Sequence, residues 1–246
     1  MPDDLVLMYH SVEPYTWDPY RVTVHPERFA RQLAWLSRCG WRGTSMRELL
    51  RARREGRARR LVGLTFDDGY ADFVTHVMPV LERYGCTATV FVIAGALGTT
   101  NGWDEPGPRK WLMSADEVRH AAAAGIEIGS HSLSHPRLTG LTDGVLAEEV
   151  RHSRAILADL TGQEVDGFCY PYGAVGAREV DAVRAAGYGY GCAVGRSLPT
   201  GRYTVPRTFI GDRDTAPRLL AKWARHHATA RLAARRPGSD TRRAMR

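Results

Sequence analysis

Three polar clusters in the sequence could do chemistry, and each follows a short apolar run typical of a buried strand. They are Asp67-Asp68, His131 with His135, and Pro171-Tyr172-Gly173. Because His131 and His135 are four residues apart, they can turn two imidazoles to one side of a turn, and one Asp carboxylate would complete a set of three metal ligands. Three protein ligands leave positions for water, which is typical of catalytic rather than structural zinc sites. The second carboxylate could take the proton of that water as a general base.

The elements that must bring these clusters together are predicted by an alternation of apolar runs and amphipathic helical patterns. The predicted strands are 5–9, 61–66, 87–93, 126–129, 167–170, 188–193 and 203–207. Helical patterns between them indicate seven or so βα units around a parallel sheet, in one barrel-like α/β domain. The carboxyl ends of parallel barrel strands meet at one rim, so we expect the three clusters to lie close together there.

Local signals predict two helix starts and one unusual loop. Ser45 with Glu48, and Ser114 with Glu117, have the spacing of capping boxes, in which each partner satisfies an amide of the first helical turn. Residues 95–110 are rich in Gly and Pro and too long for a simple connection. We therefore expect a functional loop there.

Composition and charge exclude several classes of protein. The chain has 246 residues, 43% of them hydrophobic and 25% charged, which excludes fibrous and disordered proteins. Residues 216–246 hold nine of the 34 basic residues and one of the 27 acidic ones, which leaves residues 1–215 with a net charge of −1. We therefore predict a catalytic domain at 1–215 with no nucleic-acid partner, followed at 216–246 by a basic helix and a disordered tail. Weak electrostatic contact of that tail with an anionic surface is the one further partner predicted.

The cysteines and the apolar segments indicate a reduced, soluble protein. No two cysteines form a CxxC pair, so we expect free buried thiols rather than a zinc knuckle or a redox motif. The four are Cys39, Cys86, Cys169 and Cys192. No run approaches the roughly 18 apolar residues of a membrane span, and no signal peptide is visible at the start. These observations predict a cytoplasmic protein, with export by an unrecognised route as the alternative.

The three clusters resemble the motifs of a known family. Thr65-Phe-Asp-Asp-Gly69, His131-Ser-Leu-Ser-His135 and Tyr170-Pro-Tyr-Gly173 look like the first three motifs of the polysaccharide deacetylase family, also called the NodB homology domain or carbohydrate esterase family 4. The resemblance implies a single distorted (β/α)7 barrel, TIM-barrel-like and of NodB type. It also implies a metal-dependent hydrolase that removes N-acetyl groups from saccharides containing N-acetylglucosamine, cleaving a non-peptide amide bond with a metal-activated water.

The resemblance also implies a role for each motif residue. Asp67 would be the general base, and the Tyr172 backbone N–H, positioned by Pro171, would stabilise the oxyanion. One divalent metal would be held by Asp68, His131 and His135. In this family the metal is usually zinc, and cobalt, nickel, manganese and iron are the alternatives.

The sequence departs from the commonest family pattern at two positions. The downstream Asp-rich and Leu-x-His motifs are missing, and the chain opens instead with Leu7-Met-Tyr-His-Ser11, which is similar to the permuted branch that acts on poly-N-acetylglucosamine. That similarity implies His10 as the general acid, against the alternative of a structural histidine. Cys169 stands where many members carry an Arg that orients the base. Arg207, at the end of a late predicted strand, could supply that charge, against the alternative of a structural arginine.

Aromatic residues near the predicted strand ends could contact a sugar, because flat aromatic faces suit pyranose rings. We expect Trp103, Tyr170 and Tyr172 to do so, although most aromatic residues in such a chain belong to the core. The remaining candidates are Tyr9, Tyr70 and Trp111.

Two other functions remain open on the same scaffold. The protein could be a deacetylase or amidase acting on a small N-acetylated biosynthetic intermediate, or on an acetyl ester. It could also be a catalytically inactive barrel that binds carbohydrate. The four intact motif residues argue against lost activity, since a decayed site would have little reason to keep Asp67, Asp68, His131 and His135 together.

Overall fold

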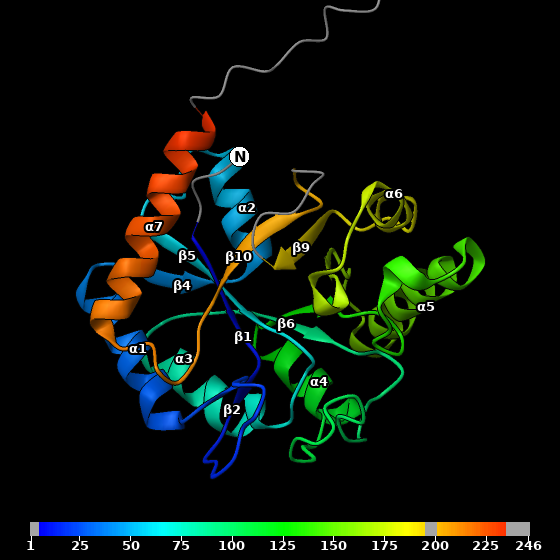
Figure 1. Cartoon of the computed structure of the whole chain (residues 1–246), viewed down its shortest axis with the longest axis horizontal. Coiled ribbons are helices and arrows are strands. Elements are labelled where there is room, and N and C mark those ends of the chain that lie inside the picture. Colours follow the sequence, from blue (N-terminus) through cyan, green and yellow to red (C-terminus); the bar gives the residue numbers. More distant parts are fainter. Residues whose placement is uncertain (1–4, 195–200, 235–246) are drawn as a thin grey trace, which may run out of the picture.

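Seven parallel strands close into a barrel in the computed structural model, which describes residues 5–194 and 201–234 (Figure 1). The strands are β1 (Val6–Tyr9), β5 (Leu61–Phe66), β6 (Thr89–Val92), β7 (Glu127–Ser130), β8 (Gly167–Cys169), β9 (Tyr190–Val194) and β10 (Val205–Phe209). The barrel is closed because β1 pairs in parallel with both β5 and β10. This confirms the predicted (β/α)7 barrel, and no predicted strand end is displaced by more than two residues.

Helices cover the outside of the barrel, and three short strands lie outside the ring (Figure 1). The helices are α1 (Pro26–Arg38), α2 (Met46–Arg54), α3 (Met78–Arg83), α4 (Ala115–Ala123), α5 (Asp143–Thr161), α6 (Ala177–Ala185) and α7 (Ala216–Ala234). Strand β4 (Arg42–Thr44) extends the sheet beside β5, and β2 (Ser11–Val12) pairs with β3 (Thr23–Val24) beyond the end of β1. Short helical turns occur at η1 (Phe73–Val77), η2 (Leu138–Gly140) and η3 (Pro171–Gly173).

Glycine on neighbouring strands makes room for large rings inside the barrel. A Cβ atom at Gly129 would lie 2.5 Å from the ring of Phe91, and one at Gly167 would lie 2.2 Å from the Tyr190 hydroxyl. Real Cβ atoms do not approach other atoms this closely, so a side chain at either glycine would displace a buried aromatic ring.

The amino end of the barrel is closed by the first turn of α2. The Met46 amide donates a hydrogen bond to Thr89 Oγ1 at 2.8 Å, and the Arg47 amide donates to Glu127 Oε2 at 2.8 Å. Thr89 and Glu127 are the first residues of β6 and β7. A site for a ligand must therefore be built at the carboxyl end of the strands.

One of the two predicted capping boxes is complete. Ser114 and Glu117 each accept from the other's backbone amide. At α2, Ser45 accepts from the Glu48 amide, but the Glu48 carboxylate instead binds Arg42 at 2.6 Å and the Thr44 hydroxyl. The prediction of a full capping box at Ser45 is therefore wrong, because β4 offers Glu48 a cation and a hydroxyl.

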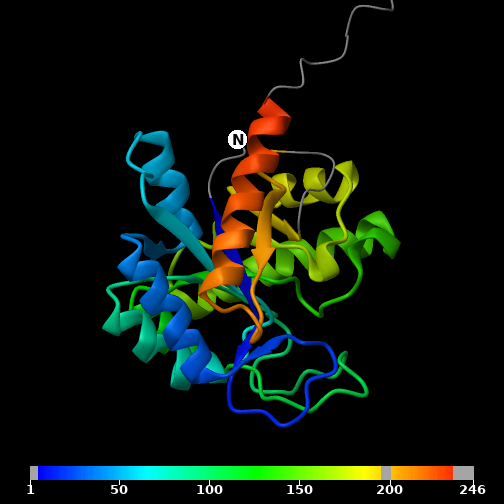
Figure 2. The ribbon, with the colours of Figure 1, turned by 60° about the vertical axis from the view of Figure 1, so that its left-hand side comes forward.

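Helix α7 lies along the side of the barrel (Figure 2), and its inner face joins the core. Leu219 is buried, and the Trp223 ring packs edge-on against Trp41, with 6.5 Å between ring centroids. The predicted helix is therefore present, while the predicted disordered tail lies outside the described residues. The boundary at 215 stays a prediction. Within the described ranges, no helix is long and apolar enough to span a membrane.

The cysteines are free thiols, as expected, but they are not all buried. Cys169 and Cys192 are buried in the barrel, Cys86 is half-buried, and Cys39 is exposed at the end of α1. The expectation of burial is therefore wrong for Cys39, because it follows the last turn of that helix on the surface.

Candidate active site

Three side chains converge at the carboxyl end of the barrel. Asp68 follows β5, and His131 and His135 follow β7. Asp68 Oδ1 lies 3.2 Å from His131 Nε2 and 3.4 Å from His135 Nε2, and all three side chains are buried. Asp68 and His135 have positive φ angles of 70° and 64°, a region that non-glycine residues adopt at a cost. These turns bring the carboxylate and the second imidazole to the same point.

The segment that carries the two histidines is held by further hydrogen bonds. His131 Nδ1 lies 2.8 Å from the carbonyl oxygen of Cys169, which leaves Nε2 facing Asp68. Between the histidines, the Leu133 and Ser134 amides both donate to the buried Glu149 carboxylate at 2.9 Å. Such outer contacts fix the orientation of imidazoles in metal sites.

Asp68, His131 and His135 fit a divalent metal ion. Their ligand atoms all lie within 4.8 Å of one another, and one carboxylate with two imidazoles suits zinc and similar transition metals. A second candidate set, Asp67 with His131 and Cys169, shares one histidine with the first. It is the poorer set, because Arg207 already binds both oxygens of Asp67.

Without a metal, the buried acid and the two histidines affect each other's protonation. Burial alone would raise the pKa of Asp68, but its hydrogen bond with His131 and the charges of the histidines hold that pKa well below its usual range. Burial and, to a smaller extent, the charge of the neighbouring His131 lower the pKa of His135 to about 4. A carboxylate and a neutral imidazole are the forms that bind metal ions.

Asp67 is held by Arg207, which enters the site from β10. The Nη1 and Nη2 atoms of Arg207 donate to Asp67 Oδ1 at 2.5 Å and Oδ2 at 2.8 Å. Arg207 also donates to Thr65 Oγ1 at 3.1 Å and to Cys169 Sγ at 3.0 Å. Burial alone would raise the pKa of Asp67, but the guanidinium holds it below its usual value. Arg207 therefore fixes Asp67 as a carboxylate beside Asp68, His131 and His135 and favours its ionised form.

His10 lies directly after β1, on the edge of the site. Its Nε2 atom is 4.0 Å from Asp67 Oδ2, and its side chain is 18% exposed. Its Nδ1 atom is buried and has no hydrogen-bond partner among the described residues. One nitrogen of His10 therefore faces the carboxylate from a position that solvent can reach.

Tyr172 and Trp103 flank His135. Tyr172 has a positive φ of 59°, and its amide N–H has no acceptor in the described part of the chain, so it is free to donate to a ligand. The rings of Tyr172 and Trp103 lie 4.7 Å and 4.5 Å from that of His135. Pro171, which starts the η3 turn, is buried behind Tyr172. Trp103 comes from the long loop at 95–110, which therefore reaches the site as expected.

The prediction that the Tyr170 side chain faces a sugar is wrong. The side chain is 1% exposed and packs edge-on against Phe168, with ring centroids 5.2 Å apart. Tyr170 directly follows β8, and its side chain belongs to a core cluster that includes residues of α5 and α6. Tyr9 and Tyr70 are buried as well, and Trp111 is exposed.

A buried lysine that the sequence analysis did not select joins the loops around the site. Lys110 Nζ donates to Ser11 Oγ at 2.7 Å and Thr23 Oγ1 at 2.6 Å, and it pairs with Glu13 at 2.9 Å. Tyr20 also donates to the carbonyl of Glu105, so the loops at 13–22 and 95–110 lie side by side (Figure 2). No sequence pattern distinguishes such a lysine from an exposed one in a loop.

A closed parallel barrel with two carboxylates and two histidines at its carboxyl rim is an arrangement that could hold a metal ion for catalysis. The model of the family described as polysaccharide deacetylase matches residues 54–191. The chain belongs to this family, as its three motifs predict.

Curated relatives and solved structures agree with this assignment. YxkH of Bacillus subtilis, named as a polysaccharide deacetylase, is 28% identical over 188 residues, which are 76% of this chain and 62% of that protein. This chain thus spans less than two thirds of that relative. The poly-β-1,6-N-acetyl-D-glucosamine N-deacetylase of Staphylococcus aureus is 23% identical over 218 residues, covering 83% of this chain and 73% of the relative.

The solved structures show the same fold. The deacetylase PplD of Streptococcus pyogenes, in complex with acetate, superposes with a TM-score of 0.75 at 23% identity, covering 89% of this chain and 97% of that one. IcaB of Ammonifex degensii superposes with a TM-score of 0.73 at 22% identity, covering 91% and 97%.

Proposed function

We propose that this protein removes N-acetyl groups from saccharides that contain N-acetylglucosamine. The observation that carries the proposal is the convergence of Asp68, His131 and His135 beside a carboxylate, Asp67, that an arginine holds ionised. The Staphylococcus aureus relative, named for deacetylation of poly-β-1,6-N-acetyl-D-glucosamine, supports this substrate class.

Asp68, His131 and His135 would hold one divalent metal, for which zinc is our proposal. A metal there supplies a water of lowered pKa and polarises a carbonyl group. Asp67 would accept the proton of that water at a carboxylate oxygen. Its two hydrogen bonds from Arg207 keep it ionised, and each oxygen retains a further lone pair for the proton.

The remaining groups of the site would act on the acetamide. The free Tyr172 amide would donate to the carbonyl oxygen as negative charge develops on it. His10, in its protonated form, would give a proton to the departing amine nitrogen. The rings of Trp103 and Tyr172 would flank the acetyl group and the sugar that carries it.

Metal analysis combined with acetate release tests this proposal. The purified protein is measured for bound metal and for acetate release from N-acetylglucosamine oligomers, before and after chelation and after zinc is restored. We expect about one metal ion per chain and an activity that chelation removes and zinc restores. Bound metal with no acetate release from any oligomer would overturn the assigned substrate class. Acetate release that survives complete metal removal would overturn the assigned chemistry.

A further inference from the structure

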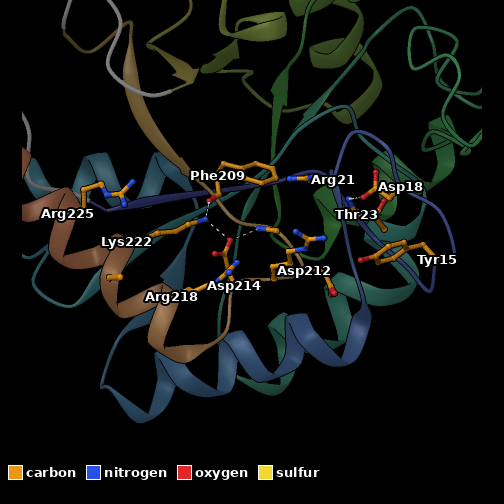
Figure 3. A pocket seen from close by; sticks show the side chains of 13 residues that line it. Tyr15, Asp18, Arg21, Thr23, Phe209, Asp212, Asp214, Arg218, Lys222 and Arg225 are labelled. Carbon is orange, nitrogen blue, oxygen red and sulfur yellow. Dashed lines mark hydrogen bonds and ion pairs between the residues drawn. The ribbon is translucent and has the colours of Figure 1, made fainter.

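A cavity lies between α7 and the loop at 13–22 (Figure 3). Its volume is about 530 Å³, within the range of sites for small molecules. Tyr15, Asp18, Arg21 and Thr23 line one side of it, and the turn between β10 and α7 and the first turns of α7 line the other.

The walls of this cavity carry more basic than acidic residues. Its cationic residues are Arg21, Arg213, Arg218, Lys222 and Arg225. Its acidic residues are Asp18, Asp212 and Asp214. Arg21 and Arg213 come from the predicted catalytic domain, whereas Arg218, Lys222 and Arg225 belong to the basic segment 216–246.

The three carboxylates of the cavity are already engaged in holding the backbone. Asp18 accepts from the Thr23 amide at 2.7 Å, and Asp212 accepts from the His25 amide at 2.9 Å. Asp214 accepts from the Gly211 amide at 2.8 Å and pairs with Lys222 at 2.5 Å, a contact drawn in Figure 3.

Three of the cavity's arginines are left without a carboxylate. Within residues 5–194 and 201–234, the side chains of Arg21, Arg213 and Arg218 form no ion pair. Guanidinium groups present paired N–H donors that match the oxygens of a phosphate. Arginines supplied by a loop, a turn and a helix around one cavity could donate to several oxygens of one such group.

Phe209 lies between the cavity and the candidate active site. Phe209 lines the cavity, and its ring centroid lies 6.2 Å from that of His10. His10 Nε2 in turn lies 4.0 Å from Asp67. A ligand that reaches from Asp67 into the cavity would have to pass His10 and Phe209, because no residue of the candidate site lines the cavity itself.

We propose that this cavity binds a phosphate group carried by the saccharide whose N-acetyl group is cleaved. The inference rests on the proposed function and narrows its substrate class to a phosphorylated, N-acetylated saccharide. The arginines would favour the anionic substrate over a neutral one of the same length, while the tyrosine and phenylalanine of the walls would contact the sugar between the phosphate and the metal ligands.

Matched substrates test the proposal. The values of kcat/KM are measured for a neutral N-acetylglucosamine trisaccharide and for the same trisaccharide with a phosphate on its reducing-end carbon 1. The wild-type enzyme is compared with Arg213→Gln/Arg218→Gln and with the control Arg119→Gln, which removes an exposed arginine of α4. We expect the phosphorylated substrate to be preferred about tenfold by the wild-type and control enzymes, and the double variant to lose most of that preference.

Two results would overturn the proposal: equal kcat/KM for both substrates in the wild-type enzyme, or a preference that the double variant keeps. If neither trisaccharide releases acetate, the proposed function fails, and calorimetric titration then tests the cavity separately. Tighter binding of the phosphorylated trisaccharide to the wild-type protein than to the double variant would support the cavity. Binding of inorganic phosphate without any preference between the trisaccharides would also contradict it, because the phosphate would not then belong to the substrate.

Discussion

The guanidinium of Arg207 donates to both carboxylate oxygens of Asp67, although the two residues are 140 positions apart in the sequence. Arg207 lies on β10, and Asp67 follows β5. Both strands pair with β1, so closing the barrel brings the two groups together. A planar guanidinium that binds both oxygens fixes the plane of the carboxylate as well as its charge.

We predict that Arg207→Gln lowers kcat more than it changes KM, because Asp67 loses its orientation and its counter-charge. It should also lower the free energy of unfolding by about 3 to 5 kcal/mol, since a buried carboxylate is left without its partner. Arg207→Lys should restore folding better than activity, because an ammonium group cannot bind both oxygens in one plane. Steady-state kinetics and urea unfolding measure the two effects.

The control for this experiment is Cys169→Ala. Cys169 Sγ lies 3.0 Å from Arg207 Nη2 and 3.5 Å from Asp67 Oδ2, but the thiol supplies no charge to either group. Its removal should change kcat by less than about tenfold. A larger loss of kcat in Cys169→Ala than in Arg207→Gln would contradict the assigned role of the arginine.

Asp67→Asn should keep its metal and lose its turnover. The amide has the shape of the carboxylate but cannot accept a proton, so the expected loss is about 10²- to 10⁴-fold in kcat, as for other general bases. Metal content is measured on the same preparation. Loss of the metal together with the activity would show that Asp67 is a ligand, and kcat within a few-fold of the wild type would remove it from the proton transfer.

His131→Ala and His135→Ala should each lose metal and activity together. Each imidazole provides one of three predicted ligands, and its removal leaves two. His120→Ala, which changes an exposed histidine of α4, is the matched control and should behave like the wild type. A full metal content in either ligand variant would exclude that histidine from the metal site.

The barrel and the positions of Asp67, Asp68, His131 and His135 could be predicted from the sequence for one physical reason. Asp67 and His131 directly follow a strand, Asp68 and His135 come within five residues of one, and parallel strands end at a common rim whatever the details of packing. Each motif lies within a few consecutive residues. The residue types and their spacing in the sequence are therefore enough to predict that its side chains lie at this rim.

Features that depend on packing between distant segments could not be predicted in the same way. Tyr170 follows a strand, as the motif residues do, but its ring joins the core because Phe168 offers an aromatic neighbour there. Lys110 can be buried because Ser11 of β2, Thr23 of β3 and Glu13 beside them accept its three protons. From the sequence, Arg207 could either orient Asp67 or be a structural arginine. Only the register of β10 beside β1 decides between these two roles.

His10→Ala should slow the cleavage of amides more than the cleavage of activated esters. A departing amine needs a proton, whereas an aryl oxide leaves without one, so the loss in kcat on an N-acetylated sugar should be about 10²-fold or more. The loss on an aryl acetate should be far smaller. Comparable losses on both substrates, or loss of the metal, would mean that His10 acts on the metal site or on Asp67 rather than on the leaving group.

The carboxylate of Asp72 predicts a pH dependence of stability that is separate from catalysis. It accepts hydrogen bonds from Ser11 Oγ at 2.6 Å and from the Val12 amide at 2.9 Å. Burial raises the pKa of Asp72 from 3.8 to about 6, because these hydrogen bonds and the charge of Lys110 offset only part of the cost of desolvation.

The folded protein therefore binds a proton at Asp72 between about pH 4 and pH 6, where the unfolded chain does not. It follows that the contribution of Asp72 to the free energy of unfolding is greatest below about pH 4 and falls as the pH rises to about 6, by about 3 kcal/mol. Asp72→Asn keeps an acceptor for the Val12 amide and removes the titration, so the wild type should lose stability relative to this variant across that interval.

Urea unfolding of both proteins at several pH values from about 4 to 7 measures the difference between their free energies of unfolding. Groups that titrate in the same way in both proteins cancel from this difference. Asp116→Asn is the control, because the Asp116 side chain is 93% exposed and its removal should leave the pH profile unchanged. Parallel profiles for the wild type and Asp72→Asn would show that Asp72 stays ionised in the folded protein. The cation of Lys110 would then compensate fully for the burial of the carboxylate.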